Sequence, residues 1–409
     1  MNKTCVISCP VGCYAGYGAR SRDLVKSIIR QYPDWDIKIL DQRWGDTRRT
    51  FLKDYPDEEL TSRIVPNLTI QPDVWIQITV PNEFQPVGKF NIGITAAMET
   101  TICDVSWVEG CNRMNLVLTS SEHGKFSLIN SKYVNNKTGE QIELKTPVEI
   151  LFEGIDPEIY NSRDNSDAPS ETIDSFLYRT VETKWNFLCV GHWLKGDFGQ
   201  DRKNIAYTIK MFLETFKDQE DAPGLILKVS GGIASIPDRY QILDKIYKIR
   251  ESVQYSKSLP KIYLIHGDLS DSEMNYLYNN PRVKCMVSFT KGEGYGRPLA
   301  EFAAIGKPVL CSGWSGQVDF LDGQYTAFVG GKLEKVHPSA QVKNMILPEA
   351  SWFTPDDASV KVGYESLYRD YQYWLTKAKK QAKIINSQKS IDAMQKALAE
   401  IFTRHEIDG

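Results

Sequence analysis

The sequence lacks the features that mark membrane-spanning and strongly charged proteins. No stretch of its 409 residues approaches the roughly 18 consecutive apolar residues that a spanning helix needs, so we expect no stable membrane insertion. Basic and acidic side chains number 49 and 52, and the formal net charge of -3 gives no overall attraction to nucleic acid or anionic lipid, although a local basic groove is compatible with it. The composition is otherwise ordinary and predicts a folded protein of about two to three domains.

Cysteine is also scarce. The eight cysteines, spread from Cys5 to Cys311, are too few for a disulfide scaffold. The opening residues MNKTCVISCPVGC contain one lysine and an apolar run broken by Pro10 and Gly12, a pattern that is not typical of a secretory signal. We therefore expect reduced thiols and a cytoplasmic protein.

Metal and hydrolase motifs are not recognisable in the sequence. Cys5, Cys9 and Cys13 recur every four residues, which matches neither zinc nor iron–sulfur ligand spacing. The five histidines suggest no triad, and no Gly-x-Ser-x-Gly turn occurs. We assign no metal and disfavour a serine or cysteine hydrolase.

The chain alternates short β-rich runs with helical patterns, which is typical of parallel βαβ units. In the first part, strands are predicted at 4–10, 36–41, 73–80, 90–97, 116–121 and 147–156, with a helix at 21–32. A second series follows, with strands at 184–193, 224–230, 261–267, 283–290 and 307–313 and helices at 204–216 and 298–306.

These patterns predict an α/β protein with two doubly wound, Rossmann-like domains that face each other across a cleft. The N-terminal domain is expected at 1–160, a polar linker at 161–183 and the second domain at 184–361. Helices at 362–409 are expected to pack back toward the N-terminal domain.

The most informative segment is KGEGYGRPLAEFAAIGK at 291–307. A strand is predicted to end at Thr290, and Pro298 stands where a helix would begin, since proline is favoured at the first helical position. The intervening loop, Gly294 to Gly296, would present free backbone N–H groups at the positive end of a helix dipole. Such a loop suits a phosphate.

Two carboxylates flank this loop, Glu293 before it and Glu301 inside the first helical turn. An ionised carboxylate can accept two hydrogen bonds from a vicinal diol, so the pair suits the two sugars that flank the diphosphate of a nucleotide sugar. Either glutamate alone is equally consistent with a solvated turn residue. The combination with the glycine loop and the proline favours the nucleotide sugar.

The Glu-x7-Glu segment from Glu293 to Glu301, embedded in EGYGRPLAE, resembles the donor-site motif of retaining GT-B glycosyltransferases of the family 4 group. Three further segments are similar to that family in the same order: LFEGIDPEIY, CVGHWLKGDFGQDRKNI and GDLSDSEMNYLY. SFTKGEGYGRPLAE and WSGQVDFL also resemble tailed-phage members. The resemblance implies a GT-B fold, a hexosyl- or pentosyltransferase with a UDP-sugar favoured as co-substrate, and no required cofactor. Asp34 and Asp36, superficially an Asp-x-Asp metal motif of the other glycosyltransferase fold, precede a strand, so no metal is assigned.

The resemblance also implies residue roles. Glu293 would bind hydroxyls of the donor sugar and Glu301 those of the ribose, while Arg202 and Lys203 would neutralise the departing diphosphate. Fixed cations aimed at the leaving group stabilise its developing charge, although the two residues are also consistent with a solvated helix start. The resemblance implies further donor contacts on this side from Gly267, Leu269, Gly294, Tyr295, Gly296 and Arg297. Arg297 replaces a residue that is commonly apolar in the family, and either contacts the donor or pairs with a neighbouring carboxylate.

A second glycine-rich loop joins the first strand to the first helix. Its residues Gly16, Tyr17 and Gly18 would let another helix N-terminus approach the donor phosphate. The same loop, with Asp41 ending the second strand, raises an NAD(P)-dependent Rossmann enzyme as an alternative. Ser21 stands where that motif needs its third small residue, which weakens the alternative.

On the acceptor side the sequence departs from the family. Many members carry a histidine after the fourth strand, where this chain has Glu99, which we interpret as a base, a sugar-hydroxyl acceptor or a buried helix-start carboxylate. His123 is expected to be structural. Asn82 and Glu83 follow a strand and are candidates for the acceptor pocket.

The resemblance implies a front-face mechanism in which the leaving phosphate helps to take the acceptor proton. With the phage-like match, the acceptor would be a hydroxymethylated pyrimidine in DNA and the protein would act in the host cytoplasm. Arg43, Arg48 and Arg49 would then contact phosphates, although a solvated charged loop is favoured for them. Polysaccharide, lipid and protein acceptors stay open, as does a non-catalytic sugar-nucleotide binding protein.

Overall fold

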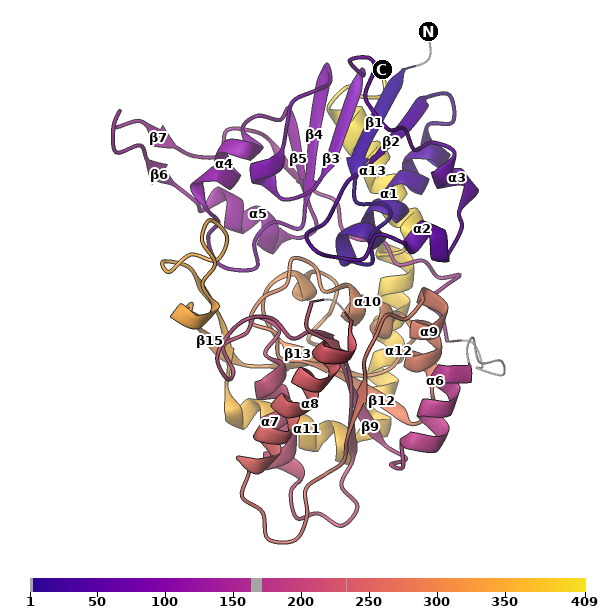
Figure 1. Cartoon of the computed structure of the whole chain (residues 1–409), viewed down its shortest axis with the longest axis vertical. Helices are drawn as coiled ribbons and strands as arrows, with labels where there is room; N and C mark the ends of the chain where they lie inside the picture. The colour runs from indigo at the N-terminus through magenta and orange to yellow at the C-terminus, as the bar shows by residue number, and fades with distance from the viewer. Residues whose placement is uncertain (1–2, 163–170, 233) are drawn as a thin grey trace. The chain divides into compact units, whose positions relative to one another are not determined.

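A computed structural model describes residues 3–162, 171–232 and 234–409 (Figure 1). The chain divides into two compact units. Unit 1 comprises Met1–Gly154, Gln341–Ala350 and Lys389–Gly409, and unit 2 comprises Ile155–Ala340 and Ser351–Gln388. Each unit is built on its own six-stranded sheet, and each is described by itself.

The sheet of unit 1 has the order β2-β1-β3-β4-β5-β8, and its neighbouring strands pair in parallel. Its strands are short apolar runs, as expected when helices cover both faces of a parallel sheet. Their bounds are β1 (Thr4–Cys9), β2 (Asp36–Asp41), β3 (Val74–Ile78), β4 (Phe90–Thr95), β5 (Leu116–Thr119) and β8 (Val148–Ile150).

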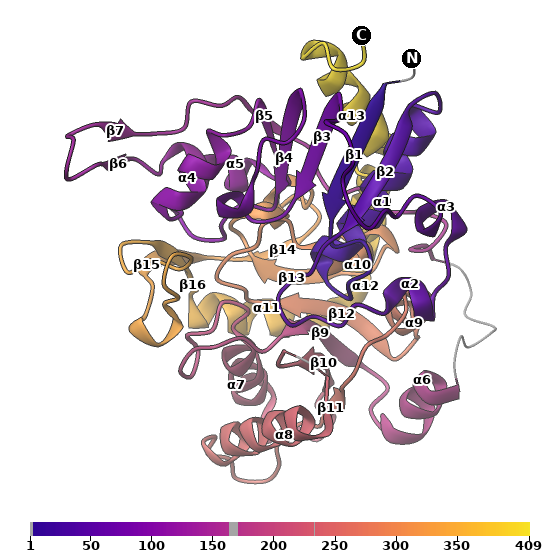
Figure 2. The same cartoon turned by 45° about the horizontal axis from the view of Figure 1, so that its top comes forward.

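Helices from both ends of the sequence cover this sheet. Its helical segments are α1 (Gly16–Gln31), α2 (Phe51–Asp54), α3 (Glu58–Thr61), the 3-10 turn η1 (Pro81–Glu83), α4 (Val105–Cys111), α5 (Glu122–Ile129) and α13 (Ile391–Arg404). A small hairpin pairs β6 (Tyr133–Val134) with β7 (Gln141–Ile142). Leu398 and Phe402 of α13 pack in one core with Leu24 of α1 and Ile7 of β1, so the C-terminal helix completes the N-terminal unit (Figures 1 and 2).

The sheet of unit 2 has the order β11-β10-β9-β12-β13-β14 and is also parallel (Figure 2). Counted from its own first strand, this order is that of a doubly wound Rossmann sheet, in which the direction of strand addition reverses between β9 and β12. The strands are β9 (Asn186–His192), β10 (Gly224–Ser230), β11 (Ile262–Ile265), β12 (Val283–Ser288), β13 (Val309–Ser312) and β14 (Ala327–Val329).

The remaining elements of unit 2 surround this sheet. The helical segments are α6 (Glu171–Ser175), the π turn η2 (Phe176–Thr180), α7 (Ile205–Phe216), α8 (Ile236–Glu251), α9 (Asp271–Asn279), α10 (Arg297–Ala304), the 3-10 turns η3 (Gly316–Asp319) and η4 (Pro338–Ala340), α11 (Asp357–Arg369) and α12 (Tyr371–Gln388). An antiparallel hairpin joins β15 (Gly331–Lys335) to β16 (Ser351–Pro355). Tyr364 of α11 packs against Phe187 of β9 and Phe212 of α7 at the centre of the core.

The structure has a strand in each predicted run, but it corrects several bounds: β8 covers only Val148–Ile150 of the predicted 147–156, and β12 ends at Ser288 and not at Thr290. α1 begins at Gly16 and not at 21, so residues 16–20 belong to the helix and not to the loop before it. α8, β14 and the hairpin β15–β16 were not predicted. Residues 163–170 of the expected linker lie outside the described residues, and α6 and η2 follow them.

All eight cysteines are buried and unpaired by disulfides, and burial raises the pKa of thiols such as Cys5 and Cys111. Within residues 3–162, 171–232 and 234–409, no helix is both long enough and apolar enough to cross a membrane.

Candidate active site

The carboxyl ends of β9 and β12 bring the basic pair and the first glutamate of the motif together. Arg202 and Lys203 lie in a turn after β9 and just before α7, and Glu293 lies in the loop after β12. β9 and β12 are neighbours at the point where the strand order reverses, which is where open α/β sheets bind their ligands.

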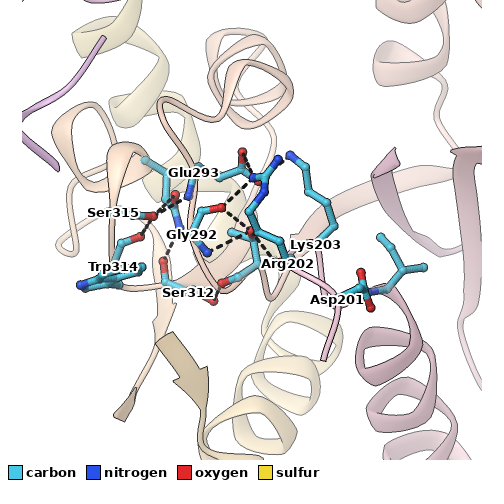
Figure 3. Close-up of polar contacts among 11 residues, drawn as sticks. Asp201, Arg202, Lys203, Gly292, Glu293, Ser312, Trp314 and Ser315 are labelled. Carbon is cyan, nitrogen blue, oxygen red and sulfur yellow. Dashed lines mark hydrogen bonds and ion pairs between the residues drawn. The ribbon is translucent and has the colours of Figure 1, made fainter. Parts of the chain in front are cut away.

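The three side chains form one ion-pair cluster (Figure 3). Lys203 Nζ lies 2.6 Å from Glu293 Oε1, and Arg202 Nη1 lies 3.3 Å from Glu293 Oε2. Arg202 Nη1 also donates to the carbonyl oxygen of Gly292 at 2.8 Å. The three side chains are only 10–17% exposed, so their interaction is weakly screened by solvent.

Electrostatics keep Glu293 ionised in this cluster. Burial raises the pKa of Glu293, but the charges of Lys203 and Arg202 outweigh it and hold the pKa below its usual value. Two cations therefore share one carboxylate, and the cluster carries an excess positive charge. Such a cluster can hold an anion such as a diphosphate.

A second segment fixes the loop that carries Glu293. The hydroxyl of Ser315 accepts the backbone N–H of Glu293 at 2.9 Å (Figure 3). The backbone N–H of Gly316 donates to the carbonyl of Glu293 at 3.0 Å. A Cβ atom at Gly316 would lie 2.4 Å from the carbonyl oxygen of Gly294, so only glycine allows this approach. Sequence reasoning missed both residues, although the Gly-Trp-Ser-Gly run after a predicted strand was a usable signal.

The glycine loop leads directly into α10. Gly296 precedes the helix in a left-handed conformation with φ +102°, which favours glycine, and Pro298 is the second helical residue. The first turn of α10 contains no acidic residue, which corrects the expectation that Glu301 lies inside it. The side chain of Tyr295 is buried and packs on Phe320, with ring centroids 4.8 Å apart, so this residue can offer a ligand only its backbone.

Glu301 is buried and has a partner for each carboxylate oxygen. Arg297 Nε lies 2.9 Å from Oε1, and the hydroxyl of Tyr278 donates to Oε2 at 3.1 Å. Of the two alternatives for Arg297, the structure shows the pairing with a neighbouring carboxylate. Burial raises the pKa of Glu301 to about 7, although Arg297 opposes the shift.

The loop that carries the donor-binding candidates Gly267 and Leu269 follows β11 at the same edge of the sheet. Gly267 has φ +129°, and a Cβ atom there would meet nothing within 4 Å. Beyond Leu269, Ser270 and Glu273 form a reciprocal capping box that starts α9.

In unit 1, Gly16, Tyr17 and Gly18 belong to α1 and not to the glycine-rich loop that the sequence predicted between the first strand and the first helix. A Cβ atom at Gly18 would lie 2.1 Å from the carbonyl oxygen of Cys13, whereas one at Gly16 would meet nothing within 4 Å. The buried hydroxyl of Tyr17 lies 3.1 Å from Thr95 Oγ1 and accepts the backbone N–H of Ala96 at 2.9 Å, so it ties α1 to the end of β4.

Asp41, the ribose-binding candidate of the dinucleotide alternative, is engaged within unit 1. Its Oδ1 accepts the backbone N–H of Gly12 at 3.1 Å, and its Oδ2 lies 2.9 Å from Arg49 Nη2.

The acceptor candidates lie at strand ends of unit 1. Glu99 is partly buried in the loop between β4 and α4, which does not begin until Val105, so it is not a helix-start residue as one interpretation held. Backbone groups of Glu99 and Met98 hydrogen-bond His123, whose pKa burial lowers to about 4. Asn82 and Glu83 are exposed in η1, after β3.

No group of three or more His, Cys, Asp or Glu side chains in the described parts of the chain could hold a metal ion. The arrangement instead offers two cations, two buried carboxylates and a helix N-terminus at one edge of the unit 2 sheet.

Comparison with known proteins identifies the fold. No protein-family model matches the chain, and no curated protein matches it. Sucrose-phosphate synthase from Thermosynechococcus elongatus is similar over 100% of both chains, with a TM-score of 0.62 and 10% identity. Anabaena HepE in complex with UDP-glucose is similar over 98% of this chain and 99% of that one (TM-score 0.60, 12% identity). A glycosyltransferase from Rickettsia africae is similar over 98% of both chains (TM-score 0.62, 12% identity). The chain therefore has the two-sheet α/β fold of GT-B glycosyltransferases.

Proposed function

We propose that the chain is a retaining glycosyltransferase that moves a sugar from a nucleoside-diphosphate sugar to an acceptor hydroxyl. One observation carries the proposal. Lys203 and Arg202 converge on Glu293 at the strand-order reversal of the unit 2 sheet, beside a glycine loop that starts a helix. This combination provides cations for a diphosphate and a carboxylate for sugar hydroxyls.

The chemistry assigns separate tasks to these groups. The bond between the anomeric carbon and the phosphate oxygen breaks, and charge develops on the departing diphosphate while the sugar becomes oxocarbenium-like. Lys203, Arg202 and the start of α10 stabilise that charge more in the transition state than in the ground state. The acceptor oxygen forms its bond on the same face, and its proton passes to the leaving phosphate, so the anomeric configuration is retained.

A UDP-sugar is the favoured donor. HepE is described with bound UDP-glucose, and a further structural neighbour, an E. coli trehalose-6-phosphate protein, is described with UDP-2-fluoro glucose (TM-score 0.58, 12% identity). In this chain the loop after β11, with Gly267 and Leu269, would face the base and Glu301 the ribose.

Thermal stabilisation tests the donor class. We expect UDP-glucose or UDP to raise the melting temperature more than GDP- and ADP-sugars or NAD(P), because a ligand at 100 times its Kd adds about 2.7 kcal/mol. Stabilisation by NAD(P) alone would support the dinucleotide alternative instead.

Release of UDP from UDP-glucose tests catalysis. Glu293→Ala should abolish release, while Glu365→Ala, which removes an ion pair with Arg369 on α11, should not change it. A wild-type protein that binds UDP-glucose but shows neither hydrolysis of it nor transfer to polysaccharide, lipid, protein or DNA acceptors would be a binding protein and not an enzyme. A transfer product with inverted anomeric configuration would contradict the front-face mechanism.

The acceptor is proposed only as a hydroxyl group. A hydroxymethylated pyrimidine in phage DNA rests on sequence resemblance alone. Of the arginines suggested for it, Arg48 pairs with Asp54 at 2.6 Å and Arg49 with Asp41 at 2.9 Å, which reduces the charge they offer to phosphates. Duplex binding whose affinity does not fall with rising salt would exclude phosphate contacts in this loop.

A further inference from the structure

Two side chains, Arg297 and Tyr278, hold the carboxylate of Glu301 in place. The carboxylate is buried between two elements of unit 2. Arg297, four residues earlier on α10, holds Oε1 at 2.9 Å, and Tyr278 of α9 holds Oε2 at 3.1 Å. The side chain of Arg297 is only 13% exposed, and Tyr278 is fully buried.

These two contacts leave acceptor capacity on both oxygens. An ionised carboxylate offers about four lone-pair sites, two on each oxygen. Arg297 and Tyr278 each use one, on different oxygens, so each oxygen can accept one more hydrogen bond. Two neighbouring acceptors at a fixed spacing match the two hydroxyls of a ribose.

We propose that Arg297 and Tyr278 are positioning residues that fix the Glu301 carboxylate so that it selects a ribonucleotide over a 2′-deoxyribonucleotide. The inference rests on the proposed function, which it deepens by naming the residues behind nucleoside selection. Neither residue needs to touch the donor, because each acts through Glu301.

The other charged and titratable groups around Glu301 set the conditions for this role. Asp271 of α9 raises the pKa of Glu301, and Tyr160, whose hydroxyl donates to Asp271 at 3.2 Å, is electrostatically coupled to Glu301. Burial is the largest effect and raises the pKa of Glu301 to about 7, while Arg297 and Tyr278 oppose that shift. The two positioning residues therefore also favour the ionised, acceptor-only form.

Binding of UDP and 2′-deoxy-UDP measures this role directly. We expect the wild type to bind UDP at least about tenfold more tightly at about pH 8, since a hydrogen bond to a charged group is lost with the 2′-hydroxyl. Arg297→Met should bring the two dissociation constants to within about threefold of each other, chiefly by weakening UDP. Tyr278→Phe should reduce the ratio in the same direction.

A pH series separates positioning from simple packing. The affinity for UDP-glucose, whose diphosphate has no group that titrates near neutral pH, should fall as the pH drops and Glu301 takes up a proton. In Arg297→Met this fall should begin at a higher pH, because the ionised carboxylate has lost its cation. Arg297→Lys, which keeps the charge but not the Nε geometry, should restore the pH profile without restoring the full UDP preference. Arg369→Met is the matched control, since it removes another arginine spaced four residues from a glutamate on a helix of unit 2.

Each outcome decides one question. If Arg297→Met leaves the ratio of the dissociation constants for UDP and 2′-deoxy-UDP unchanged, whether or not both nucleotides bind more weakly, the positioning role is wrong. A wild type that binds both nucleotides equally also overturns it while the proposed function stands, whereas a wild type that binds neither UDP nor GDP nor ADP contradicts the proposed function itself. If Arg297→Met does not fold, Arg297→Lys and Tyr278→Phe decide the same question.

Discussion

Lys203 provides the most direct test of the proposed chemistry. Its Nζ lies 2.6 Å from Glu293 Oε1, and the two side chains are 17% and 10% exposed, so the charge is fixed in a poorly solvated place. Lys203→Met removes the charge and keeps much of the volume. We expect kcat for UDP-glucose to fall about 10²- to 10³-fold, which is the usual cost of losing one donor aimed at developing charge, about 2.7–4 kcal/mol.

In the same variant, the loss of UDP affinity should be smaller than the loss of kcat. A charge-assisted hydrogen bond contributes about 1.5–3 kcal/mol, so the Kd for UDP should rise by about ten- to a hundredfold. Steady-state assays of UDP release give kcat, and calorimetry gives the Kd for UDP. If KM rises while kcat is unchanged, Lys203 binds substrate and transition state equally, and the proposed role in stabilising the leaving group is refuted.

Two controls separate this role from the ion pair with Glu293. Removing one partner of a fully buried pair costs about 3–5 kcal/mol of folding free energy, but Arg202 still contacts Glu293, so we expect a smaller loss. Lys248→Met breaks an exposed ion pair with Asp244. It should leave turnover unchanged and should lower the free energy of unfolding by no more than about 1 kcal/mol. Restored turnover in Lys203→Met with Glu293→Gln would show that Lys203 serves only to neutralise Glu293, and it would also contradict the essential role proposed for the Glu293 carboxylate.

Three further predictions concern the support of the site. Burial raises the pKa of Asp201 to about 6, above its unfolded value, so the stability that the protonated side chain contributes is lost as the pH rises from about 4 to 6. Asp201→Asn should remove this pH dependence of about 3 kcal/mol in the free energy of urea unfolding. An unchanged dependence of that free energy on pH would contradict the prediction. Lys307 Nζ donates to three backbone carbonyls at 2.6–2.9 Å, so Lys307→Met should cost about 2–4 kcal/mol in urea unfolding, and a loss below 1 kcal/mol would show that water replaces those bonds. Gly316→Ala should displace the glycine loop and raise the Kd for UDP, measured by calorimetry, at least about tenfold. Gly232→Ala should leave this Kd unchanged, because a Cβ atom there meets nothing within 4 Å. Equal Kd values for the two variants would mean that the loop adjusts freely.

The strands could be predicted from the sequence because their signal is local. Runs such as those of β1 and β10 are buried on both faces and therefore nearly continuous in apolar residues. α8 was missed because apolar residues occur on more than one side of it: Ile242, Ile246 and Ile249 are buried, while Ile236 and Tyr240 are 73% and 67% exposed. Such a helix has no clean apolar stripe to recognise.

The contacts between site residues could not be predicted from local patterns, because they depend on tertiary placement. The family resemblance assigned Arg202 and Lys203 to the donor site, but not the ion pair between Lys203 and Glu293, which lie 90 positions apart. The anchoring by Ser315 and Gly316 comes from a segment beyond the next strand. Only Arg297 lay within reach of local reasoning, since residues four apart share a helix face.

The two glutamates share one arrangement and differ in the source of their cations. Each carboxylate oxygen of the two glutamates contacts a cation or a hydroxyl, and a side-chain hydrogen bond with Thr290 also lowers the pKa of Glu293. Two cations hold the pKa of Glu293 below its usual value, whereas a single arginine does not overcome burial at Glu301, whose pKa stays near 7. Glu293 therefore remains ionised where Glu301 begins to take up a proton. On the proposed assignment of the site, we therefore expect loss of donor binding on mild acidification to come from Glu301 and not from the cluster around Glu293.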